Sequence, residues 1–78
     1  MAHLHFNFGN FVHKADRNEL ALHHFDMAIR LDPYMATAYN NRGATLLAAS
    51  YERYERQSMA INDFGWAVKL DATLIRTV

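Results

Sequence analysis

Histidine is the residue type in this chain that most suggests chemistry, because imidazole binds metals and exchanges protons near neutral pH. The sequence contains five histidines: His3, His5, His13, His23 and His24. On a helix, His3 and His5 point to different faces, and so do the adjacent His23 and His24. The chain has no His-Glu-x-x-His motif and no cysteine. We therefore interpret the histidines as surface or groove residues, and predict no metal site and no cofactor.

The carboxylates give no better case for catalysis. Asp16, Asp32 and Asp71 stand where helices are expected to begin or end, which is a common structural use of aspartate. The spacing of the acidic residues supports no Ser-His-Asp triad and no paired-carboxylate site. We predict that the protein is not an enzyme.

Composition narrows the possible partners. The chain has 78 residues, 51% of them hydrophobic, and its eight basic and eight acidic residues give a formal net charge of zero. This balance does not suggest binding to nucleic acid or to an acidic membrane surface. No apolar run approaches the roughly 18 residues of a membrane span, and the first residues lack the pattern of a signal peptide. We expect a cytoplasmic protein with neither nucleic-acid nor membrane partners.

The apolar pattern predicts four helices. The first is expected over residues 2–14, where four apolar residues are spaced for one buried stripe: Leu4, Phe8, Phe11 and Val12. Asp16, followed three residues later by Glu19, matches a capping box and predicts that a second helix starts near Arg17. Pro33 predicts its end, because the residue before a proline disfavours the α conformation. The buried face of this second helix is expected to contain Leu20, Ala21, Phe25, Ala28 and Ile29.

Two further helices follow the proline. The third is expected to begin near Ala36 and to contain Tyr39, Gly43, Leu46 and Leu47. The fourth is expected to contain Ala60, Ile61, Phe64, Ala67 and Val68, and to end at Leu70–Ala72. These four helices would position every polar side chain considered above.

The second half of the chain repeats the first. Gly9 and Gly43 are about 34 residues apart, a period typical of stacked helical hairpins. The residues that recur with the same later spacing are Ala21, Phe25, Ala28 and Pro33 in the first half, and Ala60, Phe64, Ala67 and Ala72 in the second. Small residues allow two helices to approach closely, and phenylalanine fills the space between them.

With these residues the chain resembles two tetratricopeptide repeats, one over residues 2–35 and one over 36–72, with 73–78 as the start of an incomplete third. Tyr39 with the Arg42-Gly43 pair also matches the family pattern, whereas His5 stands at a position where the family usually has a large aromatic residue. The resemblance implies an all-α fold of two stacked antiparallel hairpins, which is a fragment of a right-handed α-solenoid. It also implies a role in binding another protein.

The second repeat carries an insertion of about five residues between Leu46 and Met59, where the family has a tight turn. The inserted residues favour helix, and Glu52 and Arg56 are spaced for an i,i+4 ion pair. We expect a longer hairpin with its turn near 54–58. The alternative is one helix of about 35 residues, which would place the fourth helix on another chain as a domain swap.

In this family the first helix of each hairpin lines a concave groove. Asn10 and Asn41 match two asparagines with which one subfamily holds a terminal carboxylate, but Phe6 stands where that subfamily has a lysine. We therefore expect the groove to bind a helix or an extended peptide with aromatic or amide groups. The predicted groove residues are His3, Phe6, Asn10, His13, Thr37, Asn40, Asn41, Ala44 and Leu47.

Two repeats leave an apolar face on the last helix, because solenoid hairpins normally bury such faces against a neighbouring repeat. The residues expected there are Ile61, Trp66, Val68, Leu74 and Ile75. An apolar patch on a small chain favours association, and we expect a homo-oligomer with two-fold symmetry. Two functions therefore remain open: a peptide- or protein-binding module that uses the groove, and a structural element that associates with itself or belongs to a longer repeat array.

Overall fold

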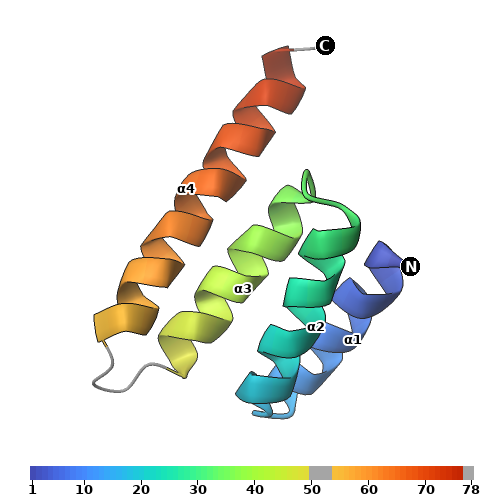
Figure 1. Ribbon diagram of the computed structural model, residues 1–78, viewed down its shortest axis with the longest axis vertical. Helices are drawn as coiled ribbons and strands as arrows, with labels where there is room; N and C mark the ends of the chain where they lie inside the picture. The colour runs from blue at the N-terminus through green and yellow to red at the C-terminus, as the bar shows by residue number, and fades with distance from the viewer. Residues whose placement is uncertain (50–53, 77–78) are drawn as a thin grey trace.

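The computed structural model describes residues 1–49 and 54–76, with side chains placed for 1–49 and 56–71. Every regular element in the described residues is an α-helix: α1 (Ala2–Lys14), α2 (Asn18–Leu31), α3 (Ala36–Ala48) and α4 (Tyr54–Arg76). The helices lie side by side in chain order, with α1 and α4 at opposite edges (Figure 1). They form two antiparallel hairpins, α1–α2 and α3–α4, and α2 packs against α3. The all-α prediction and the bounds of the first helix are confirmed. No described helix is long and apolar enough to cross a membrane.

The turn between α1 and α2 differs from the predicted capping box. Asp16 has φ of 61°, and α2 starts at Asn18 without a side-chain cap. The Asp16 amide donates to the His13 carbonyl, and the Arg17 amide donates to the Val12 carbonyl. These two bonds make a Schellman motif, in which a residue in the left-handed conformation closes the preceding helix. The capping prediction is therefore wrong, because Asp16 ends α1 instead of opening α2.

Both hairpins pack through the same glycine–phenylalanine contact. A Cβ atom added to Gly9 would lie 2.7 Å from the Phe25 ring, and one added to Gly43 would lie 2.9 Å from the Phe64 ring. Neither position has room for a methyl group. The repeat in the sequence thus corresponds to a repeated close contact between helices.

The predicted buried face of α2 is confirmed. Ala21, Phe25 and Ala28 are buried, and Leu20 and Ile29 pack at the edge of the same clusters. The predicted stripe on α1 is wrong for three of its four residues, because Val12 is buried but Leu4, Phe8 and Phe11 are exposed. Gly9 and Val12, not that stripe, face α2. Leu4 and Phe11 are mostly exposed, whereas Phe8 is half-exposed because its ring also contacts His24 of α2.

The two hairpins end differently. Helix α2 ends at Leu31, two residues before Pro33, as predicted. Helix α4 continues to Arg76, so its predicted end at Leu70–Ala72 is wrong. The residue equivalent to Pro33 is Ala72, which keeps its backbone N–H and is the strongest helix former, so nothing stops the helix there.

The second hairpin forms within one chain. Helix α3 ends at Ala48, helix α4 begins at Tyr54, and the two pack against each other. The predicted turn near 54–58 is wrong, because those residues belong to the first turn of α4. The expected pair between Glu52 and Arg56 involves a residue outside the described ones. Arg56 makes an ion pair with Glu19 of α2, at 2.6 Å.

Candidate functional site

The face formed by α1 and α3 contains the predicted groove, and several of its polar groups bond to one another. The Asn41 amide donates to the Asn10 side-chain oxygen over 2.6 Å. The Thr45 hydroxyl donates to the Asn41 carbonyl and lies 3.2 Å from Nδ1 of His13. These contacts join the first helices of the two hairpins. The amides proposed to hold a ligand therefore already have partners within the chain.

The remaining predicted groove residues divide into two groups. Phe6 is half-buried and packs on both hydrophobic clusters, where its ring centroid lies 6.0 Å from that of Phe25. The others are exposed at the surface: His3, Thr37, Asn40, Ala44 and Leu47. Sequence reasoning placed Phe6 in the groove because it could not anticipate that the core needs this ring.

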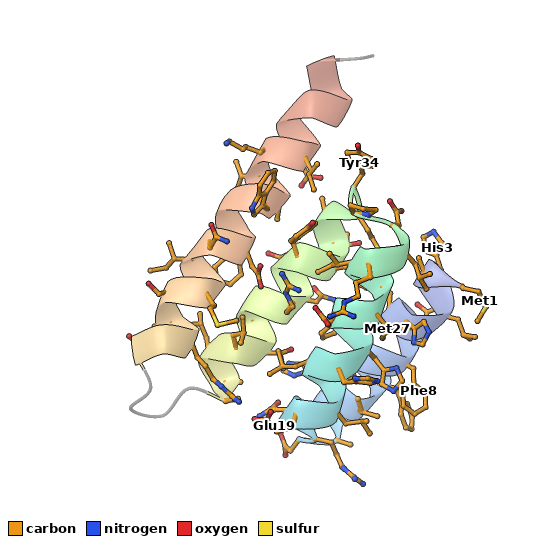
Figure 2. All side chains as sticks on the ribbon, in the orientation of Figure 1. Met1, His3, Phe8, Glu19, Met27 and Tyr34 are labelled. Carbon is orange, nitrogen blue, oxygen red and sulfur yellow. The ribbon has the colours of Figure 1, made fainter. Side chains whose placement is uncertain are left out.

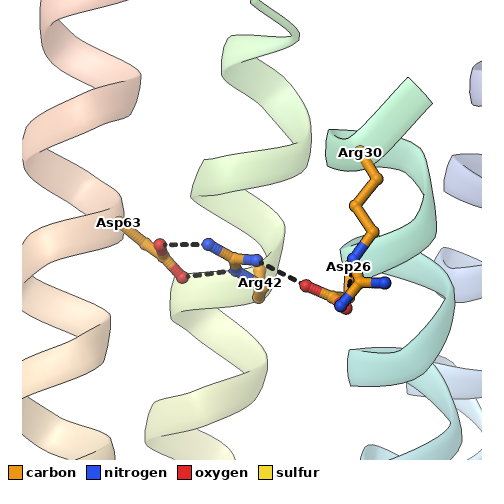
Figure 3. Close-up of polar contacts among 4 residues, drawn as sticks. All are labelled: Asp26, Arg30, Arg42 and Asp63. Atoms are coloured by element: carbon orange, nitrogen blue, oxygen red, sulfur yellow. Dashed lines mark hydrogen bonds and ion pairs between the residues drawn. The ribbon is translucent and has the colours of Figure 1, made fainter. Parts of the chain in front are cut away.

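An arginine at the centre of the molecule connects three helices (Figure 3). Arg42 of α3 makes a two-point contact with Asp63 of α4, at 2.9 Å and 2.8 Å, and its third nitrogen lies 3.2 Å from Asp26 of α2. Arg30 makes a further ion pair with Asp26, at 3.3 Å. Asp63 is buried, and its hydrogen bond with Arg42 is the main cause of the raised pKa of that arginine. This network holds the hairpins together.

A recess opens at the end of the molecule between α3 and α4. We call it the end recess; it is lined by Ala36, Thr37, Asn40, Phe64, Ala67, Val68 and Asp71. Its walls are mainly apolar, and two of its polar residues, Thr37 and Asn40, belong to the predicted groove. Sequence reasoning therefore found one wall of the recess and missed the wall that α4 supplies.

The same position in the first hairpin is filled. We call two residues equivalent when they match after Gly9 is aligned with Gly43 and Ala21 with Ala60. Met35, just before α3, and Ala38 of α3 belong to a cluster with four side chains of the first hairpin. These four are Ala2, Phe6, Ala28 and Ile29. The equivalents of those four are Ala36, Asn40, Ala67 and Val68, and all of them line the end recess. The recess therefore has the position and much of the lining of a site that binds a helix elsewhere in the same chain.

The outer side of α4 is also apolar. Ile61 is 71% exposed and Val68 is 69% exposed, and Gly65 lies between them on the same helical face. Trp66 is half-exposed and stacks on Tyr39 with ring centroids 6.3 Å apart. The side chains of Leu74 and Ile75, which were predicted to extend this face, lie outside the described ones.

The histidines are closer together than their sequence spacing suggests. Nδ1 of His5 lies 3.1 Å from Nδ1 of His24, and the Phe8 ring contacts His24 with centroids 4.5 Å apart. Burial lowers the pKa of His24, and the nearby His23 and His5 lower it further. Sequence reasoning compared only histidines of the same helix, His3 with His5 and His23 with His24, and so missed the contact between His5 and His24 of different helices. Among the described residues, no group of three histidine, aspartate, glutamate or cysteine side chains could hold a metal ion.

Comparison of the chain with protein families, curated proteins and solved structures finds no match. The functional argument therefore depends on the geometry of the two hairpins.

Proposed function

We propose that the protein is a protein–protein interaction module made of two tetratricopeptide-type repeats, and that its end recess binds a helix of a partner. The observation that carries this proposal is the equivalence between the end recess and the site where the first hairpin holds Met35 and Ala38. A site that binds a helix once within the chain has the shape and lining to bind a second helix.

The chemistry of the recess suits a helical ligand. Ala36 and Ala67 are buried small residues that allow a close approach, Val68 supplies an exposed apolar surface, and Asn40 offers an amide at the edge. A helix with apolar residues at i, i+4 and i+7 would match this lining. The role is one of binding, and no catalytic step is proposed.

The α1–α3 groove is the second place where a peptide could bind, as the family resemblance implies. Its asparagines are bonded to each other, with Asn41 to Asn10 at 2.6 Å, so a ligand there would first have to replace that bond. In the end recess the Asn40 amide donates to the Asn41 side-chain oxygen over 3.4 Å at an exposed site, so replacing that long bond would lose less, which is why we favour the recess.

The test is a selection of binders from a library of helical peptides with an apolar stripe, followed by NMR mapping. We expect the amide shifts of Ala36, Asn40 and Val68 to change on binding. Val68→Lys should weaken binding at least tenfold, because it would place a charge in an apolar contact. Ala44→Lys is the matched control, since Ala44 is exposed on α3 and belongs to the predicted groove but not to the recess. Loss of binding with Ala44→Lys alone would show that the groove is the binding site and that our assignment is wrong.

A further inference from the structure

Two exposed apolar stripes lie at opposite edges of the molecule. The α1 stripe consists of Leu4, Phe8 and Phe11, and the α4 stripe consists of Ile61, Gly65 and Val68. Leu4 is 63% exposed and Phe11 is 71% exposed. In Figure 2, Phe8 lies at the edge of the helix layer farthest from α4. Large apolar side chains exposed in a row on a small protein indicate a surface that another molecule covers.

Each stripe is equivalent to one side of the contact between the hairpins. The equivalents of Leu4, Phe8 and Phe11 are Ala38, Arg42 and Thr45, which face the first hairpin from α3. Ala38 and Thr45 are both 0% exposed. The equivalents of Ile61, Gly65 and Val68 are Leu22, Asp26 and Ile29, which face α3 from α2. The chain thus contains two further halves of its own α2–α3 contact, and both are exposed, although the Phe8 ring also contacts His24 of its own chain.

At one pair of equivalent positions the two stripes differ from the internal α2–α3 contact, and the two differences fit each other in size. Inside the chain, Arg42 meets Asp26 at 3.2 Å across the α2–α3 contact. Their equivalents on the outer stripes are Phe8 and Gly65. An ion pair is thus replaced by a large aromatic ring on one side and by the smallest residue on the other, which is the combination that lets a ring pack against a helix backbone.

Gly65 has no other explanation in the described structure. A Cβ atom added to it would meet nothing within 4 Å, whereas Cβ atoms added to Gly9 and Gly43 would meet phenylalanine rings. A glycine inside a helix destabilises it by about 1 kcal/mol relative to alanine. A recess lies around Gly65, lined by Ile61, Asn62, Trp66 and Lys69. If a second molecule approached closely here, Gly65 would make room for one of its side chains, as Gly9 makes room for Phe25 and Gly43 for Phe64.

We propose that the occupant of the end recess and the α4 stripe is a second copy of this chain, which docks head to tail through its α1 stripe. Leu4 of one copy packs in the end recess beside Val68, Phe8 packs on Gly65, and Phe11 packs near Ile61. The order follows from the antiparallel α2–α3 contact, in which Ala38 lies near Ile29 and Arg42 near Asp26. This inference identifies the partner in the proposed function and rests on it.

The symmetry of this contact differs from the two-fold dimer expected from the sequence. The two docking surfaces are different, so each copy keeps one free stripe after it binds, and further copies can add. One helix pair gives a small interface, and interfaces below about 1,200 Å² are weak. We therefore expect association over roughly 10 µM to 1 mM, with dimers and longer arrays growing as the concentration rises.

The test is sedimentation equilibrium with three variants. Gly65→Leu fills the site of Phe8 and should leave the chain monomeric. Its monomer should unfold no more easily than the wild type, because leucine forms helix better than glycine. Leu4→Lys removes the other surface and should also give a monomer. His3→Lys is its matched control, since it adds the same charge at a neighbouring exposed position outside the stripe and should associate like the wild type.

Mixing the two monomeric variants separates head-to-tail from two-fold contacts. Gly65→Leu keeps its α1 stripe and Leu4→Lys keeps its α4 stripe, so the mixture should form a one-to-one pair and nothing larger. A two-fold dimer through α4 would leave Leu4→Lys dimeric by itself, and one through α1 would leave Gly65→Leu dimeric. Either result overturns the proposal, as does a wild type that stays monomeric at 1 mM. If Leu4→Lys still binds selected helical peptides in the end recess in that case, the proposed function stands and only the identity of the partner is wrong.

Discussion

The two hairpins share one close contact between their own helices and differ in the residues beside that contact. Gly9 with Phe25, and Gly43 with Phe64, make the same close contact. The next layer differs, because the first hairpin has Phe8 beside His24 and the second has Arg42 bonded to Asp63 at the equivalent positions. Arg42 also meets Asp26 of the first hairpin at 3.2 Å, whereas Phe8 is half-exposed and meets no residue of the second hairpin in a ring contact of the described side chains. The two halves of the chain thus have the same residues where the helices of one hairpin contact each other. They have different residues at the positions beside that contact.

We expect the largest loss of stability from removing Arg42, which should weaken the second hairpin. Arg42→Met would leave the buried carboxylate of Asp63 without its two hydrogen bonds. Loss of one partner of a buried ion pair destabilises proteins by about 3–5 kcal/mol. We expect chemical denaturation to show a loss of this size, or no folded baseline at all in so small a chain.

Two further variants serve as controls for the Arg42→Met measurement. Arg30→Ala removes an exposed ion pair with Asp26 and should change the unfolding free energy by about 0.5 kcal/mol or less. Arg42→Met combined with Asp63→Leu should recover much of the loss, because no unpaired charge remains. A loss below about 1 kcal/mol for Arg42→Met alone would mean that water screens Asp63 and that the network does not hold the hairpins together.

Substitution of glycine by alanine should lower the stability at Gly9 and Gly43 and raise it at Gly65. Gly9→Ala and Gly43→Ala would press a methyl group against a phenylalanine ring, and overpacking of this kind destabilises by about 1–3 kcal/mol. Gly65→Ala meets open space and should stabilise the monomer by about 1 kcal/mol through helix propensity. Thermal unfolding of the three variants at low concentration measures the contrast. Equal stabilisation by all three would show that the repeated glycines reflect no packing requirement.

The sequence was sufficient to predict the inner layer of the fold. Glycine, alanine and phenylalanine recur with one spacing, and that spacing predicted the hairpins, the buried face of α2 and the start of α3. It failed for the α1 stripe, because Leu4, Phe8 and Phe11 have helical spacing whichever side of the helix is covered. Helical spacing of apolar residues predicts an apolar face on a helix, but it does not say which surface, if any within the chain, covers that face.

The candidate site was only half predictable for a related reason. Thr37 and Asn40 were found through the family pattern of the first helices, but the opposite wall of the end recess comes from α4. The Arg42 network and the His5–His24 contact each join side chains from different helices, and no local spacing indicates them. Capping failed at Asp16 because aspartate favours both helix starts and the left-handed conformation.

The turn of the first hairpin offers a smaller stabilising change. Asp16 has φ of 61°, a conformation that is strained for most residues and free of strain for glycine. We expect Asp16→Gly to raise the unfolding free energy by about 0.5–1 kcal/mol, measured by denaturant titration. Ala15→Gly is the control, since Ala15 has φ of −88° and gains nothing from glycine. A destabilised Asp16→Gly would indicate that the carboxylate contributes more to this turn than its backbone conformation does.

The smallest expected effect is a pH dependence that belongs to the first hairpin alone. Burial and the neighbouring His23 and His5 hold the pKa of His24 below its ordinary value of about 6.5. The unfolded chain, with the ordinary pKa, therefore binds more protons than the folded chain as the pH falls below that value. The contribution of His24 to stability is complete above pH 6.5 and is lost as the pH falls from there through the folded pKa.

The contribution of His24 is isolated by measuring the unfolding free energy between pH 7.5 and 5 for the wild type and for His24→Gln. Glutamine keeps a hydrogen-bonding group near His5 and does not titrate, so the variant should lose less stability on acidification. His3→Gln, an exposed position on α1, should keep the wild-type slope. The second hairpin has Asp63 at the position of His24, held by Arg42, and contributes no histidine to this pH range. Identical slopes for wild type and His24→Gln would mean that the contact between α1 and α2 admits the imidazolium freely. The difference between the hairpins would then lie in their partners and not in their response to acid.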